Sequence, residues 1–175
     1  MTRISVRGDS RLWLEGSSNV RDWTCRATQM DASIEIREGA VEFDPGFVRE
    51  VRVKVPIRML RCGDRHMEAH LYAALKAPKP PQEAFIIAEF DQLPAVRMNA
   101  QPVEVTGNLR IAGIERAVTM TVISDRLSDG THHARGTVPI LMTDFGITPP
   151  RPWGGILRTA DKVLIQFEIF IGAQQ

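Results

Sequence analysis

The sequence predicts a mainly β protein of one domain, residues 1–175, with about eight antiparallel strands and one inserted α-helix. Three observations support this prediction. Apolar and polar residues alternate in one run after another, which is typical of half-buried antiparallel strands. A single segment has the helical period instead. No Gly/Ser-rich linker, internal repeat or low-complexity tract marks a domain boundary within the 175 residues.

The alternating runs set the expected number of strands. Seven runs are apparent, around Leu12, Ile34, Val53, Leu109, Met120, Val138 and Ile165, and the apolar run FIIAEF at Phe85 adds an eighth expected strand. Eight strands are enough to close a small barrel. The same strands could also form a two-sheet sandwich, so the pattern alone leaves both closures open.

The stretch GNLRIAGIERAVTMTV, which begins at Gly107, predicts a hairpin within this set. Alternation stops at Gly113 and Ile114 and then resumes, as expected for two strands joined by a tight connection. In either closure, the apolar side of such a hairpin faces the interior.

The segment DRHMEAHLYAALKAPKPP predicts the helix, with about three turns. Met67, Leu71 and Leu75 lie about one turn apart on it. The helix is expected to end at the prolines that follow, because proline cannot continue a helix. These are Pro78, Pro80 and Pro81.

Composition argues against several classes of partner. The chain has 22 lysines and arginines and 21 aspartates and glutamates, so its formal net charge is +1. This charge provides no overall electrostatic footprint for nucleic acid or an anionic membrane surface. No apolar run approaches the roughly 20 residues of a membrane-spanning helix, so no integral membrane segment is expected. The sequence leaves monomer and homodimer open.

The histidines of HMEAH superficially resemble a zinc-protease motif. Met67 stands where that motif has glutamate, and Glu68 lies on another side of the helix from His66 and His70. A catalytic zinc normally has three protein ligands, and no third is evident. We therefore expect no metal, no cofactor and no catalytic residues.

Two further questions stay open from the residues alone. Cys25 and Cys62 have no CxxC spacing; they are either two buried thiols or one disulfide formed in an oxidising compartment. The opening MTRISVRGDS lacks the apolar core of a signal peptide, so cytoplasmic residence and a leader removed before Met1 are both possible.

Four blocks follow one another across nearly the whole chain: SRLWLEGSSNVRDWTC, VPIRMLRCGDRHMEAHLYAALKA, VEVTGNLRIAGIERAVTMTV and TDFGITPPRPWGGILRTADKVLIQFEIFI. In this order they resemble the YceI-like family of bacterial proteins. The resemblance implies an antiparallel, lipocalin-like β-barrel whose hydrophobic tunnel holds a long-chain isoprenoid or similar amphiphile. It also implies export to the periplasm and a disulfide between Cys25 and Cys62.

The function expected from the resemblance is non-enzymatic binding, transport or sequestration of a long isoprenoid or other lipid inside the barrel. Inward residues of the strands, one helix residue and one tryptophan near an end are the expected ligand-binding side chains. They are Leu71, Val105, Leu109, Met120, Val138, Trp153, Ile165 and Phe167. Two alternatives are a filled barrel that acts as a structural or interaction module, and an enzyme acting on an amphiphile through His66 and His70.

Overall fold

The structure, a computed structural model, describes residues 2–36, 48–75, 85–92 and 101–172. Within them, eleven strands form one antiparallel sheet. In sheet order the strands are β1 (Thr2–Ser5), β4 (Asp31–Ile36), β5 (Val48–Pro56), β7 (Phe85–Gln92), β8 (Pro102–Ile111), β9 (Ile114–Arg126), β10 (His132–Leu141), β11 (Thr159–Ile171), β2 (Arg11–Ser18), β3 (Asp22–Ala27) and β6 (Leu60–Arg61).

The mainly β, antiparallel, barrel-like fold is confirmed, but the expected count of about eight strands is wrong. All eight expected strands are present, and the three additional strands are β1, β3 and β6. β1 has four residues and β6 has two, which is too short for alternation to be visible. β3 has only two fully buried positions, Trp23 and Cys25.

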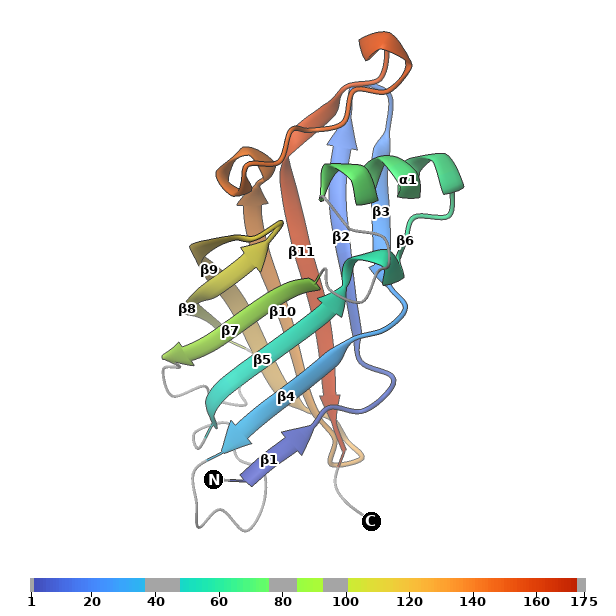
Figure 1. Cartoon of the computed structure of the whole chain (residues 1–175). Coiled ribbons are helices and arrows are strands. Elements are labelled where there is room, and N and C mark those ends of the chain that lie inside the picture. Colours follow the sequence, from blue (N-terminus) through green and yellow to red (C-terminus); the bar gives the residue numbers. More distant parts are fainter. Residues whose placement is uncertain (1, 37–47, 76–84, 93–100, 173–175) are drawn as a thin grey trace.

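The sheet curls around a common interior (Figure 1). Ile34 and Ile36 on β4 pack against Ile169 and Ile171 on β11, although these strands are not neighbours in the sheet. β1 and β6 stand at the two ends of the strand order, so the sheet forms a curled half-barrel. The inward side chains of both halves therefore meet across the interior.

The hairpin predicted from Gly107 onward is β8 and β9. Ile111 pairs with Ile114, which leaves a two-residue turn of Ala112 and Gly113. Both turn residues have positive φ, 54° and 80°, as expected for the tight turns that match the twist of a hairpin.

The one α-helix among the described residues is α1 (Arg65–Ala74), as predicted. The prolines expected to end it lie outside the described residues. The described residues also contain three short 3-10 turns, η2 (Ile57–Met59), η4 (Met142–Phe145) and η5 (Trp153–Gly155). None of the helices that the structure describes combines the length and the apolar character needed to span a membrane.

Candidate functional site

The interior of the curled sheet holds two cavities. The first, which we call the inner cavity, has a volume of about 120 Å³ and lies between β4, β5, β7 and β8 on one side and β10 and β11 on the other. Its described lining residues are all apolar except His132 and His133. This volume is slightly smaller than that of an apolar cavity of about 150 Å³ that holds benzene.

The second cavity, the helix-side cavity, has a volume of about 140 Å³. Met67, Leu71 and Leu75 of the helical segment line it on one side, and Leu14 and Val163 of the sheet line it on the other. Polar residues surround its outer part: Ser18, Arg21, Asp64, His66, His70 and Thr159. This cavity therefore combines an apolar depth with a polar mouth.

The two cavities lie end to end. Along β11, Thr159 and Val163 line the helix-side cavity, whereas Phe167 and Ile171 line the inner cavity. Ile165 between them lines both, as does Ile86 on β7. At about 3.3 Å per residue, the stretch of β11 that lines them is roughly 40 Å long. We call Ile86 and Ile165 the waist of this interior.

Glycines keep the interior open beneath aromatic rings. Gly136 on β10 pairs with Phe167 on β11, and a Cβ added at Gly136 would lie 2.0 Å from the ring of Phe167. In the same way, Gly16 on β2 pairs with Trp23 on β3, whose indole would lie 2.1 Å from an added Cβ. Each ring therefore lies flat on the wall rather than across the cavity.

Trp23 carries a polar atom without a partner. The side chain is 9% exposed and lines the helix-side cavity. Its Nε1 is buried and has no hydrogen-bond partner among the described residues. A buried indole N–H normally donates to an acceptor. The register places Trp23 between Asp22, which pairs with Ser17 near the polar mouth, and Cys25, which pairs with Leu14 in the apolar depth.

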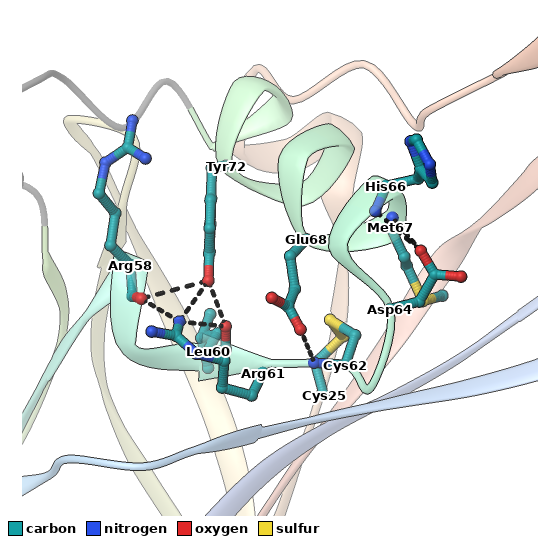
Figure 2. Close-up of a disulfide and its surroundings, with 10 residues drawn as sticks. All are labelled: Cys25, Arg58, Leu60, Arg61, Cys62, Asp64, His66, Met67, Glu68 and Tyr72. Carbon is teal, nitrogen blue, oxygen red and sulfur yellow. Dashed lines mark hydrogen bonds between the residues drawn. A yellow bond between two sulfur atoms is a disulfide. The ribbon is translucent and has the colours of Figure 1, made fainter.

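Polar contacts cap α1 and join it to the segment that precedes it (Figure 2). The Asp64 carboxylate accepts hydrogen bonds from the backbone N–H groups of His66 and Met67, at 2.8 and 3.1 Å. These bonds lower the pKa of Asp64. Glu68 accepts from the backbone N–H of Cys62 at 3.0 Å, and the Tyr72 hydroxyl donates to the Leu60 carbonyl at 2.5 Å.

A disulfide joins Cys25 of β3 to Cys62, in the segment that leads into α1 (Figure 2). The two Cα atoms are 4.1 Å apart. Cys25 is 1% exposed and lines the helix-side cavity. The bond therefore fixes the start of the helix to the wall of the cavity that the helix covers.

All eight residues expected to bind a ligand lie on these cavities. Val105, Leu109, Met120, Val138 and Phe167 line the inner cavity, Leu71 and Trp153 line the helix-side cavity, and Ile165 lines both. Trp153 differs from the others because it is 67% exposed, so it stands at the rim.

The histidines lie in two separate places, one pair on α1 and the other on β10. His66 and His70 lie on α1 at the mouth of the helix-side cavity, and Glu68 is bonded to Cys62 instead of approaching them. His133 lies on β10, where its ring nitrogens are 2.9 Å from Asp125 and 3.1 Å from Glu168. The described residues contain no group of three side chains placed to hold a metal ion.

Sequence reasoning missed Trp23 and Ile86 as parts of the site. Trp23 alternates with Cys25 in the stretch DWTC, which is a signal for an inward position. Ile86 lies in the run FIIAEF, where consecutive apolar residues do not show which side chain faces inward.

Comparison with known proteins adds the family and the fold. A family model described as the YceI-like domain matches residues 14–171. A crystal structure of BcnA from Burkholderia cenocepacia is 19% identical, with a TM-score of 0.73, over 95% of this chain and 99% of that one. A polyisoprenoid-binding domain from Saccharophagus degradans, implicated in plant cell wall breakdown, is 14% identical, with a TM-score of 0.70, over 97% and 98%.

A third solved structure is less similar in its fold. The YceI protein of Campylobacter jejuni is 16% identical to this chain, with a TM-score of 0.57, over 86% of this chain and 85% of that one. No curated protein sequence matches the chain. At these identities the solved structures establish that the fold is shared.

Proposed function

Because this chain belongs to the YceI-like family, we propose that it binds a long-chain amphiphile in its interior, as a non-enzymatic carrier or sequestering protein. The observation that carries this proposal is the pair of apolar cavities joined end to end at Ile86 and Ile165. A long, narrow, apolar space suits a chain-like ligand better than a compact one.

The tail of the ligand would occupy the inner cavity. Its walls offer apolar contacts along the whole length of the β11 half that lines it. Burial of each methylene contributes about 0.8 kcal/mol. A tail of about ten carbons thus supplies several kcal/mol after the entropy cost of binding is subtracted.

The head of the ligand would lie in the helix-side cavity. Arg21, His66 and His70 surround its mouth, together with Asp64. The unpartnered N–H belongs to Trp23, which pairs with Gly16, next to the Ser17–Asp22 pair near this mouth. It suits a head that carries an acceptor oxygen, such as an isoprenoid phosphate, a carboxylate or a carbonyl compound, since buried N–H groups are normally satisfied.

The comparisons support the same ligand class. One solved relative with this fold is described as a polyisoprenoid-binding domain. A polyisoprenoid or a fatty-acid-like lipid is therefore the ligand we propose for this chain. We also propose that the protein functions in the periplasm or another exported compartment, because the Cys25–Cys62 disulfide persists where the environment is oxidising.

Mass spectrometry of detergent-free protein tests the proposal, in the native state and after organic extraction. We expect a long-chain amphiphile at one copy per chain, or uptake of one when isoprenoid phosphates or fatty acids are offered. Apo protein that takes up neither would favour the filled-barrel interaction module. Conversion of an offered amphiphile to a product of different mass would favour the alternative that the protein is an enzyme, provided that His70→Ala loses this conversion.

A pair of variants on β9 shows whether a bound lipid occupies the interior. Met120 is buried and lines the inner cavity, so Met120→Trp places a large ring in the space of the tail. Thr121→Trp is the control, because Thr121 is exposed on the outer side of the same strand. Lipid should be lost in the first variant and retained in the second.

A further inference from the structure

One end of the molecule carries a compact structural unit, which we call the tip, made of residues 18–22 and 150–159. The two segments are joined by backbone and side-chain hydrogen bonds. Asn19 N–H donates to the Arg158 carbonyl at 3.1 Å, and Arg158 N–H donates to the Asn19 side-chain oxygen at 2.6 Å. Thr159 N–H donates to the Pro150 carbonyl at 3.1 Å, which closes the longer segment. In Figure 1 this segment rises beyond the ends of β2 and β3.

The tip exposes large apolar side chains to solvent. Val20 is 65% exposed, Trp153 67% and Ile156 73%. They are three of the five large hydrophobic residues that are exposed in the described part of the chain. Exposed apolar groups gathered in this way mark interaction sites.

The backbone holds Trp153 outward at a conformational cost. Its φ is 56°, and the two glycines that follow also have positive φ, 65° and 89°. A bulky residue with positive φ is a genuine outlier, and such strain is typical of functional positions. Trp153 also lines the rim of the helix-side cavity, so this ring stands beside the mouth.

The charge of the tip is locally positive, although the chain as a whole is nearly neutral. Its two segments contain Arg21, Arg151 and Arg158, all exposed, and a single acid, Asp22. None of the three arginines forms an ion pair within the residues that the structure describes. Asp64 is the other acid at the mouth, where its carboxylate caps α1.

We propose that the tip docks on an anionic phospholipid bilayer. Trp153, Ile156 and Val20 enter the interface between head groups and acyl chains, where tryptophan is favoured. The arginines contact lipid phosphates, since basic residues near an anionic leaflet are attracted to its surface. Docking in this way turns the mouth of the helix-side cavity toward the bilayer. The purpose of docking rests on the proposed carrier function, whereas the contact itself requires no bound lipid.

A protein partner fits this surface less well. A specific protein interface needs about 800 Å² from each partner, and even an aromatic side chain buries only about 150–250 Å². Three protruding side chains therefore fall short of a stable dimer. A bilayer interface needs no matching shape, and its negative charge complements the arginines.

Vesicle co-sedimentation tests the docking. Wild-type protein is mixed with vesicles of equal parts phosphatidylglycerol and phosphatidylcholine, or with phosphatidylcholine alone. We expect clear binding to the anionic vesicles, weaker binding to the neutral ones, and a loss of binding as salt is raised. Val20→Ser with Ile156→Ser should reduce partitioning about tenfold or more, and neither residue lines a cavity.

The arginines have their own variant. Arg151→Gln with Arg158→Gln should weaken binding to anionic vesicles strongly and binding to neutral vesicles little. The matched controls are Leu127→Ser and Arg126→Gln, at the β9–β10 turn near the other end of β11. These controls should bind as the wild type does.

The outcomes separate docking from lipid carrying. If Val20→Ser with Ile156→Ser retains its lipid in native mass spectrometry and loses vesicle binding, both proposals stand. If wild-type protein binds neither vesicle type, or if the control variants lose vesicle binding as much as the tip variants do, the docking proposal is overturned and the carrier proposal is not. A dimer in light scattering that the same double variant dissociates would identify the tip as a protein interface and also overturn the proposal.

Discussion

Gly136 and Phe167 show how a single hydrogen atom in place of a side chain shapes the interior. The ring of Phe167 occupies the space that a Cβ at residue 136 would fill. The cavity beside it therefore depends on the absence of a side chain as much as on the apolar residues around it.

We expect Gly136→Ala to displace the Phe167 ring into the inner cavity. The added Cβ would lie 2.0 Å from that ring, and overpacking of this kind costs about 1–3 kcal/mol. Chemical denaturation should show the lost stability, and mass spectrometry should show less bound lipid. Gly8→Ala is the control, because nothing lies within 4 Å of a Cβ there. Unchanged lipid content in Gly136→Ala would contradict this account of the wall.

Trp23 tests whether the site recognises the head of its ligand. Trp23→Phe removes the unpartnered N–H and keeps an aromatic ring over Gly16. We expect about fivefold weaker binding of an isoprenoid phosphate or fatty acid, since one buried hydrogen bond is worth about 1 kcal/mol, and unchanged binding of a hydrocarbon of equal length. Titration of both ligands measures this. Trp13→Phe is the control, because the Trp13 N–H already donates to Glu15 at 2.7 Å.

Alternation predicted which residues face inward, and the structure places the predicted wall residues on the cavities. Alternation could not predict that the buried N–H of Trp23 lacks a hydrogen-bond partner among the described residues. That feature depends on where the indole lies relative to Gly16 and to its neighbours across the cavity. Such distances between strands are set by the curl of the sheet, which no local pattern contains.

At the scale of elements, α1 is the part whose position decides the shape of the helix-side cavity. It buries none of its ten residues fully, so packing alone holds it weakly. The Asp64 cap, the Glu68 and Tyr72 contacts and the disulfide beside them supply the remaining constraint.

The cap makes this end of the helix sensitive to acid. Hydrogen bonds from the Met67 and His66 N–H groups lower the pKa of Asp64. The cap therefore stabilises the fold above the unfolded pKa of about 3.9. Its contribution is lost as the pH falls through the lower folded value.

We expect Asp64→Asn to flatten this acid dependence, since asparagine caps a helix without titrating in this range. Asp64→Ala should destabilise the protein at neutral pH as well. Urea unfolding between about pH 2 and pH 7 measures both. An Asp64→Asn protein with the acid dependence of the wild type would show that other carboxylates control it.

The helix and seven strands were predictable because each has a clear period over several residues, and β7 was predictable from the apolar run FIIAEF. β1, β3 and β6 were not, since β1 has four residues, β6 has two, and β3 has only two buried positions, so no local pattern is long enough to reveal them. β6 exists because Leu60 and Arg61 pair with Ala27 and Arg26. That pairing follows from the path of the chain around the sheet.

At the scale of the whole molecule, the resemblance predicted a hollow interior, and the structure shows that it has two parts. The residues that separate them, Ile86 and Ile165, come from β7 and β11 on different parts of the sheet. No sequence pattern links these two positions.

Narrowing the waist should shorten the ligand that fits. Ile86→Trp replaces a branched aliphatic side chain with a large ring between the cavities. We therefore expect the bound lipid to be lost or replaced by one with a shorter chain. Chain length is determined by mass spectrometry after extraction. Ile87→Trp is the control, because Ile87 is the next residue of β7 and lines neither cavity. The same lipid in Ile86→Trp and wild type would contradict a continuous interior.

The place of β11 between β10 and β2 has a consequence for how the molecule is made. Ile165 pairs with Leu14, about 150 residues earlier in the chain. During synthesis, β3 can pair with one edge of β2 early, but the partner of the other edge, β11, emerges after every other strand described. Such distant pairing forms slowly, and unpaired strand edges favour aggregation meanwhile. The wall of the interior is therefore completed last, and a chain stopped before β11 would leave the strands on both sides of the gap exposed.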